Sequence, residues 1–245
     1  MMRPTERDFL LFLLAIASGA ADGWSYTGLG HAFVANMTGN TVLLGLAVFG
    51  KGDLLGPFIS IVCYAFGVVL ASFLVRKTRE GAIWGRQVSW VLLLESFIMA
   101  AAQIGWVVLH TSTRPRLPIH FLLGAVAVAI GIQSGAMLRL RVPGVVTTYI
   151  TGTWTNLMTN LYKFAHKEKN KPAPEKIQFE ERLFMQSGIL AVYFLSAVLT
   201  GWLFVRLPIV VGALPAVSTI TVAVYSLMRN PRSLARRVIQ PRSLR

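Results

Sequence analysis

The sequence is short of cysteine and of charge, and each shortage excludes a class of protein. Cys63 is the single cysteine, so the chain can form no internal disulfide and no cluster of thiolate metal ligands. Charged residues make up 14% of the chain, against about 25% of a typical soluble domain. The P-loop, HExxH, CxxC and GxSxG motifs are absent, so we expect no enzyme activity and no bound metal or cofactor.

Acidic residues are also scarce, with 10 Asp and Glu against 24 Lys and Arg, a net charge of +14. The basic residues lie between apolar segments and at the ends of the chain, which argues against a nucleic-acid partner. Hydrophobic residues make up 54% of the sequence. We therefore predict an all-α polytopic membrane protein, whose basic tail at 229–245 lies against anionic lipid headgroups.

The apolar residues fall into four plain segments and two longer, irregular ones. Each irregular segment has an apolar piece, a piece rich in glycine or proline, and a second apolar piece with polar inserts. The plain segments are 54–75, 88–109, 183–204 and 208–228, and the irregular ones are 9–50 and 118–162. The charged stretch 163–182 is interpreted as a cytoplasmic connector.

The two irregular segments match each other. NMTGNTVLL at 36–44 aligns with YITGTWTNL at 149–157, and Gly19 and Gly23 correspond to Gly131 and Gly135. Because each segment precedes two plain spans, we predict two repeats, about 9–109 and 118–228, within a single membrane domain, 1–245. The first apolar piece resembles a signal peptide, but its glycine pattern recurs in the second repeat, so we expect a retained helix.

Each irregular segment could be one broken crossing or two full crossings. With six spans, 18 Lys and Arg lie on the side of the termini and 4 on the other side; with eight spans the division is 17 and 7. The positive-inside rule therefore favours six spans with both termini cytoplasmic. Three crossings per repeat invert the second repeat, so the predicted fold is two inverted three-helix repeats with spans 1 and 4 broken.

Polar side chains gather at both predicted breaks, where irregular backbone needs a wet cavity or buried surroundings. Hydroxyls and amides at such a place can replace part of a solute's hydration shell. An alternative is that they only join helices by close packing and hydrogen bonds. The predicted substrate-binding residues are Asn36, Thr38, Gly39, Asn40, Thr41, Thr148, Thr151, Gly152, Thr153 and Asn156.

Four charged residues at or near membrane depth are candidates for ion coupling or solute attraction. Asp22 could bind a cation, relay a proton or pair with Arg139 or Arg141, or it could form a simple helix-end salt bridge. Glu95 could couple protons, or it could be a protonated side chain bonded to a neighbouring helix. Arg139 and Arg141 could attract an anion or extend to the membrane interface.

The stretches GHAFVANMTGNTVLLGLAV and GIQSGAMLRLRVPGVVTTYITGTWTNL resemble the YoaK-like family of bacterial membrane proteins of unknown function. The likeness covers nearly the whole chain. It implies a compact multi-pass protein of the bacterial cytoplasmic (inner) membrane. It implies no activity and no substrate.

We expect a secondary transporter or permease of a small anionic or zwitterionic solute, with proton coupling as one option. A small-solute or ion channel would share the polar track but lack alternating access. A membrane scaffold or assembly protein would use the polar motif only for helix packing. The sequence identifies neither the substrate nor the oligomeric state, a homodimer included.

Overall fold

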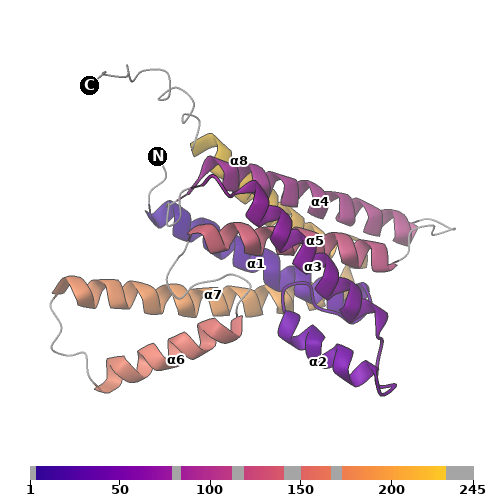
Figure 1. Cartoon of the computed structure of the whole chain (residues 1–245), viewed down its shortest axis with the longest axis horizontal. Helices are drawn as coiled ribbons and strands as arrows, with labels where there is room; N and C mark the ends of the chain where they lie inside the picture. Colours follow the sequence, from indigo (N-terminus) through magenta and orange to yellow (C-terminus); the bar gives the residue numbers. More distant parts are fainter. Residues whose placement is uncertain (1–3, 79–83, 112–118, 141–149, 167–172, 230–245) are drawn as a thin grey trace, which may run out of the picture.

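The computed structural model describes residues 4–78, 84–111, 119–140, 150–166 and 173–229. Within these ranges the chain is helical, with no strand (Figure 1). The elements are α1 (Pro4–Gly28), α2 (Met37–Ala47), α3 (Leu55–Leu74), α4 (Arg86–Thr111), α5 (Ile119–Leu140), α6 (Ile150–His166), α7 (Ala173–Arg206), the 3-10 turn η1 (Pro208–Val210) and α8 (Ala213–Arg229).

Six segments of the described chain are long and apolar enough to cross a membrane, as predicted. The shortest has 20 residues, which as a helix covers about 30 Å, the thickness of the hydrocarbon core. The short helix α2 is apolar but has only 11 residues. The six segments are Thr5–Gly28, Leu55–Leu74, Arg86–Thr111, Ile119–Leu140, Phe179–Arg206 and Pro208–Arg229.

Small residues bring α1 and α7 into close contact. A Cβ added at Gly19 would clash with the backbone carbonyl of Tyr193, and one added at Gly23 would press on the Thr200 side chain. The absence of side chains at these two positions lets the helix backbones approach, as small residues do between helices in membranes. Because later residues of α1 meet later residues of α7, the two helices run in the same direction.

A matching contact joins α3 and α5. A Cβ added at Gly131 would clash with the backbone carbonyl of Tyr64, and one added at Gly135 would press on Ala71. These helices also run in the same direction. The glycine pair that the sequence aligned with Gly19 and Gly23 therefore makes the corresponding contact between the two halves of the chain.

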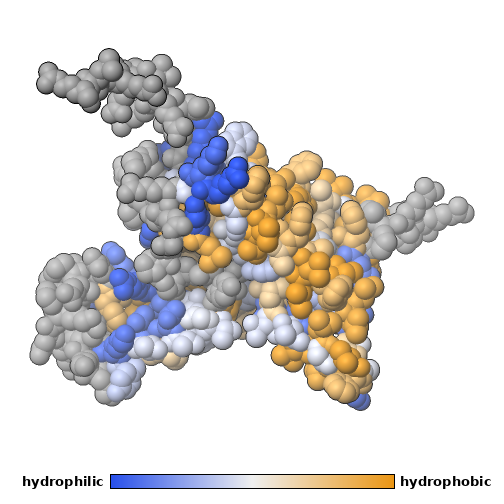
Figure 2. All heavy atoms as spheres, viewed as in Figure 1, coloured by the Kyte–Doolittle hydropathy of each residue, from blue (hydrophilic) through white to orange (hydrophobic). Residues whose placement is uncertain are grey.

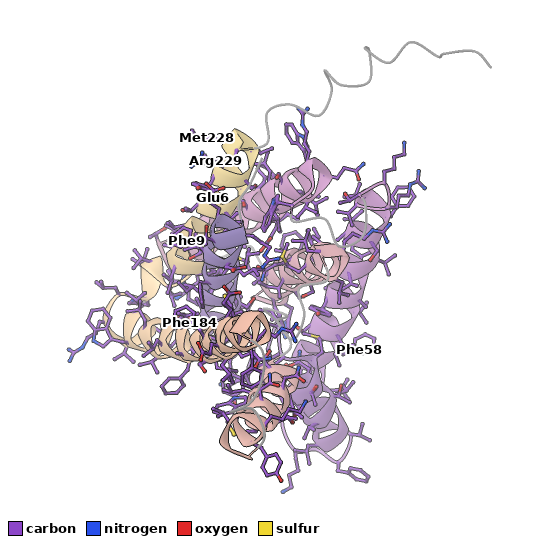
Figure 3. The ribbon with its side chains drawn as sticks, turned by 90° about the vertical axis from the view of Figure 1, so that its left-hand side faces the viewer. Glu6, Phe9, Phe58, Phe184, Met228 and Arg229 are labelled. Atoms are coloured by element: carbon purple, nitrogen blue, oxygen red, sulfur yellow. The ribbon has the colours of Figure 1, made fainter. Side chains whose placement is uncertain are left out.

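Contacts at the helix ends give the remaining directions. Glu6 in the first turn of α1 lies 3.0 Å from Arg229 in the last turn of α8, at the corner where these helices meet (Figure 3). At the opposite end of the bundle, Nε2 of Gln103 in α4 donates to the carbonyl of Ile209 at 2.8 Å. Both α1 and α4 are therefore antiparallel to α8.

Helix α5 lies at the centre of the bundle. Of its most apolar window 78% is buried inside the protein, against 22% for α3. It packs between α3 and α4. Its amide Nε2 of Gln133 also donates to the carbonyl of Leu14 in α1 at 3.2 Å and to Oγ of Ser18 at 2.9 Å. A shift of α5 would therefore disturb its contacts with α1, α3 and α4.

The outer surface fits a lipid environment along most of its length. In Figure 2 hydrophobic residues cover the middle of the visible face. Hydrophilic residues gather at the end that holds the start of α1, the end of α8 and the outer ends of α6 and α7.

The first span is continuous at the residues where the sequence predicted a break. Helix α1 continues through Asp22 and Gly23 to Gly28, because Gly23 packs against α7 instead of opening the backbone. The chain turns at Gly30 and His31, which have positive φ values of 114° and 55°. The non-helical residues 29–36 thus separate α1 from α2. In the second half α5 is continuous to Leu140, and the predicted break near Pro143 lies outside the described residues.

Candidate functional site

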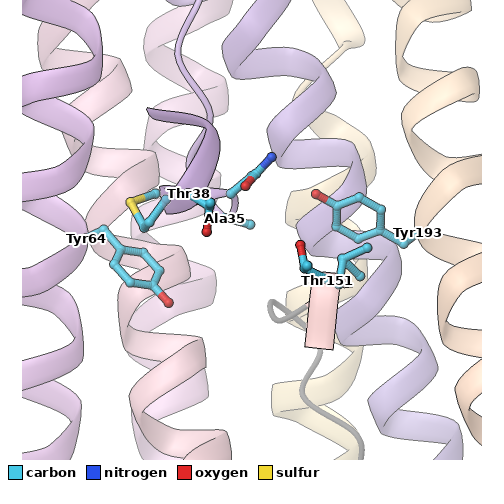
Figure 4. Close-up of a pocket in the computed structure, with 8 residues that line it drawn as sticks. Ala35, Thr38, Tyr64, Thr151 and Tyr193 are labelled. Carbon is cyan, nitrogen blue, oxygen red and sulfur yellow. The ribbon is translucent and has the colours of Figure 1, made fainter. Parts of the chain in front are cut away.

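A cavity of about 250 Å³ lies where α2, α3, α6 and α7 meet (Figure 4). Its walls are the residues at the start of the two short helices, α2 and α6, together with one tyrosine from each of the spanning helices α3 and α7. In Figure 4 Tyr64 and Tyr193 stand on opposite sides, with Thr38 and Thr151 between them. The lining residues are Ala35, Asn36, Met37, Thr38, Tyr64, Ile150, Thr151 and Tyr193.

Two asparagines fold the chain that enters α2. Asn36 caps the helix by accepting a hydrogen bond from the backbone N–H of Gly39 at 3.0 Å. The fully buried Asn40 holds Phe33 on both sides, since Oδ1 accepts its N–H at 2.8 Å and Nδ2 donates to its carbonyl at 2.6 Å. Ser60 of α3 also donates to this carbonyl. These bonds direct the first turn of α2 toward the cavity.

Asp22 anchors the same segment to α1. Its Oδ1 accepts hydrogen bonds from the backbone N–H groups of Val34 at 2.7 Å and Ala35 at 2.6 Å, and its Oδ2 accepts one from the Tyr193 hydroxyl. The side chain is buried. Asp22 precedes the end of α1 by six residues, about 9 Å of helix. The chain therefore doubles back along α1 before α2 begins.

The two cavity tyrosines occupy matching places in their helices. Tyr64 is the tenth of the 20 residues of α3, and Tyr193 is the fifteenth of the 28-residue segment Phe179–Arg206. The backbone carbonyl of each tyrosine lies against a glycine of a neighbouring helix, that of Tyr64 against Gly131 and that of Tyr193 against Gly19. The sequence analysis missed both tyrosines. Extending the repeat alignment to CYAFGVVLAS and VYFLSAVLTG would have paired them.

Three of the ten predicted substrate-binding residues line the cavity: Asn36, Thr38 and Thr151. Of the other seven, Asn40, Gly39 and Thr41 belong to α2 and make contacts within it or with the segment before it. A Cβ at Gly39 would touch Asn36. Oγ1 of Thr41 donates to the Met37 carbonyl at 2.9 Å.

The remaining predicted residues belong to α6 or precede it. Thr153 is buried, Asn156 is exposed, and a Cβ at Gly152 would meet no atom within 4 Å. None of these three lines the cavity. Thr148 lies outside the described residues, as does the predicted charged residue Arg141.

The predicted charged residues do not gather at one place. Arg139 lies in the last turn of α5 and donates to the carbonyls of Thr78 at 3.2 Å and Arg76 at 2.8 Å, beyond the end of α3. Asp22 instead bonds to Val34, Ala35 and Tyr193, so the predicted pairing of Asp22 with Arg139 is not the arrangement observed. Glu95 is fully buried on α4, which contributes nothing to the cavity wall.

The electrostatics of the cavity come from dipoles and hydroxyls. Both α2 and α6 begin at the cavity, and the N-terminus of a helix carries partial positive charge and unpaired N–H groups. The eight lining residues include no Lys, Arg, Asp or Glu. Such a site can bind a negatively charged or strongly polar group without a cationic side chain.

A second polar contact joins the two halves of the chain away from the cavity. Asp53 accepts hydrogen bonds from the backbone N–H groups of Gly56 at 2.9 Å and Leu55 at 3.1 Å, at the start of α3. The Gly56 bond is the main reason why the pKa of Asp53 lies below its usual value. Nε2 of His120 in α5 lies 3.7 Å from the same carboxylate.

Comparison with known proteins supports the predicted resemblance. A family model described as "Protein of unknown function (DUF1275)" matches residues 10–227. The UPF0700 transmembrane protein YoaK of Bacillus subtilis (strain 168) is 35% identical over 164 residues, which cover 66% of this chain and 70% of that protein. No solved structure matches the chain. With six apolar helices and these matches, the chain is a membrane protein that belongs to the DUF1275 family.

Proposed function

We propose that this protein is a secondary transporter of a small anionic or zwitterionic solute, which binds in the cavity between α2 and α6. The observation that carries the proposal is the position of that cavity. Tyr64 and Tyr193 line it from the midpoints of two spanning helices. Secondary transporters bind their substrates near the bilayer midplane, beside interrupted helices.

The chemistry of the cavity supports an anionic group on the solute. Two helix N-termini and the hydroxyls of Thr38 and Thr151 offer hydrogen-bond donors, and no carboxylate is among the lining residues. The nearby Asp22 already accepts three hydrogen bonds. A zwitterion would place its ammonium group against the hydroxyl oxygens, which accept as well as donate.

The packing supports an inverted repeat. α1 pairs with α7 as α5 pairs with α3, through corresponding glycines and tyrosine carbonyls. The core contacts put the start of α1 beside the end of α5, so these equivalent helices are antiparallel. Two halves of opposite orientation can rock about a fixed central site and open it to each side in turn.

In this proposal α2 and α6 are half-helices that enter the membrane beside complete spans. The Asp22 contact returns the chain to the middle of the bundle before α2 starts. Figure 1 shows α2 and α6 leaving the centre in opposite directions on one side of the bundle. Backbone that ends a helix at this depth needs polar surroundings, which a water-filled cavity provides. The predicted broken crossings thus become full spans followed by re-entrant segments.

The proposed orientation places both termini in the cytoplasm. The end of the bundle formed by the start of α1 and the end of α8 also carries Arg76, Lys77 and Arg139, whereas the opposite end of α3 adjoins Asp53. Cytoplasmic loops are enriched in Lys and Arg. By the resemblance to a bacterial relative, we place the protein in the bacterial cytoplasmic membrane.

Uptake into liposomes tests the proposed function. Purified protein would be reconstituted and challenged with labelled formate, acetate, lactate, glycine and alanine. For the solute that is transported, T38V and T151V should each raise the half-saturating concentration about tenfold or more, because each loses a hydrogen bond to a charged group. The matched controls T41V and T155V change hydroxyls that bond to carbonyls within their own helices, so they should transport normally.

The form of the flux separates the candidate functions. Saturable uptake that the unlabelled solute competes with would support a transporter. Rapid flux that does not saturate would instead indicate a channel. If the wild-type protein moves no member of the panel while T38V and T151V lose thermal stability, the polar motif serves packing and the transport proposal fails.

A further inference from the structure

Glu95 is a buried acidic side chain that the proposed solute site does not use. It is fully buried on α4, and neither carboxyl oxygen has a hydrogen-bond partner in the described part of the chain. It is the tenth residue of α4, about 14 Å from the start of that helix. Glu95 therefore lies well inside the membrane, not at the interface.

No opposite charge compensates Glu95 from the helices around it. Among the described residues, the charged groups of these helices are confined to the helix ends or, in the case of Asp22, bonded elsewhere. The titratable groups on α4 and on the helices packed with it are Arg86 and His110 on α4, Cys63 and Tyr64 on α3, His120 and Arg139 on α5, Tyr225 and Arg229 on α8, and Glu6, Arg7, Asp8, Asp22 and Tyr26 on α1.

The absence of compensation determines the form of the carboxyl group. An ionised carboxylate without a partner in an apolar interior is strongly disfavoured, and the group takes up a proton instead. Ionisable side chains inside transmembrane helices also commonly belong to proton relays. The Glu95 carboxyl therefore holds a proton when the bundle is packed as observed.

The position of α4 offers a path between this proton and the solute cavity. The central helix α5 packs against α4 on one side and against α3, which carries the cavity residue Tyr64, on the other. Ionisation of Glu95 would require α4 to move so that water reaches the carboxylate. That movement would disturb α5 and, through its glycine contacts, the wall of the cavity.

We propose that Glu95 is a proton-binding site and that its proton is the coupling ion, which enters with the solute in symport. The coupling rests on the transport function proposed above, whereas the proton site does not. The proton binds while α4 is packed against α5 and α8, and it leaves when that interface opens to water.

Labelling with dicyclohexylcarbodiimide tests the proton site without any transport assay. Glu95 itself is fully buried and faces the core, whereas the groove between α4 and α8 is lined by outward-facing residues of α4 such as Leu93, Leu94 and Phe97. The reagent is hydrophobic and enters the lipid phase, from which it reaches the Glu95 carboxyl when the packing of α4 opens. It adds to a protonated carboxyl to form an N-acylurea, and no atoms are lost. Peptide mass spectrometry of the reconstituted full-length protein locates the adduct.

We expect the adduct at Glu95 at pH 6, its absence in E95Q, and no adduct at Asp22, which is also buried but fully hydrogen-bonded. E181Q, which changes an exposed glutamate, should retain the Glu95 adduct. Labelling of exposed glutamates with none at Glu95 would overturn the proton site.

Transport by E95Q tests the coupling. The amide mimics the protonated carboxyl, so E95Q should fold with an unchanged melting temperature. It should lose uptake driven by an inward proton gradient, yet keep the exchange of labelled for unlabelled solute. Gradient-driven uptake equal to that of the wild type would overturn the coupling. If the wild-type protein moves no solute of the panel, the transport function and the coupling fail together, while the labelling result still decides the proton site.

Discussion

The hydroxyl of Tyr193 donates a hydrogen bond to Oδ2 of Asp22, a contact between residues 171 positions apart. The other carboxylate oxygen holds the backbone N–H groups of Val34 and Ala35. One side chain thus joins α1, α7 and the segment that enters α2. Because Ala35 and Tyr193 both line the cavity, the shape of the cavity depends on this carboxylate.

Replacing Asp22 by alanine should destabilise the protein more than removing its tyrosine partner. D22A leaves two buried N–H groups and one hydroxyl without their acceptor, and each costs about 1–3 kcal/mol. Y193F removes only one of the three bonds. Thermal unfolding in detergent should give a larger fall in melting temperature for D22A. Equal values for D22A and Y193F would show that Asp22 does not anchor residues 34 and 35.

Asn40 should be more important for folding than its neighbour Thr41. N40A leaves the N–H of Phe33 without its acceptor, at a cost of about 1–3 kcal/mol, although Ser60 still bonds to the carbonyl. T41A changes an exposed hydroxyl, so its effect should lie within about 0.5 kcal/mol. Denaturant unfolding of the two variants measures the difference. A negligible effect of N40A would contradict the conclusion that the Asn40 amide holds the backbone of Phe33 in place.

The glycine contact between α3 and α5 should tolerate no side chain. G131A pushes a methyl group against the Tyr64 carbonyl, a rigid backbone atom, and should lower both the melting temperature and solute uptake. The control G201A adds its methyl group where no atom lies within 4 Å. That variant should be neutral or more stable by about 1 kcal/mol, because alanine favours helix. If G131A behaves like G201A, the close approach of α3 and α5 is not required.

The two ends of α3 should lie on opposite sides of the membrane. Since Cys63 is the only native cysteine, a C63A background allows single cysteines at Lys51 and Lys77 to be tested. A membrane-impermeant maleimide added to intact cells should label K51C and leave K77C unlabelled until the membrane is opened. The reverse pattern would place the termini outside the cytoplasm.

Much of the architecture could be predicted from the sequence, because span length and hydropathy are local properties. The six apolar segments and the aligned glycines at positions 19, 23, 131 and 135 belong to this part. The continuity of α1 past Asp22 was not predicted, because it depends on packing against α7, far away in the sequence. For the same reason Asn40 was predicted to bind solute, whereas its amide instead holds the backbone of Phe33. Tyr64 and Tyr193 join the site only once the helices are assembled.

The most direct test of the central cavity is the reactivity of cysteines placed in its wall. In the C63A background, T38C and T151C would be exposed to a small anionic methanethiosulfonate in reconstituted membranes. A cysteine at Phe66, which α3 presents on the outer surface, serves as the lipid-facing control. We predict that T38C and T151C react, that the transported solute slows both reactions, and that F66C does not react. Cysteines at positions 38 and 151 as unreactive as F66C would contradict a wet solute site between the two short helices.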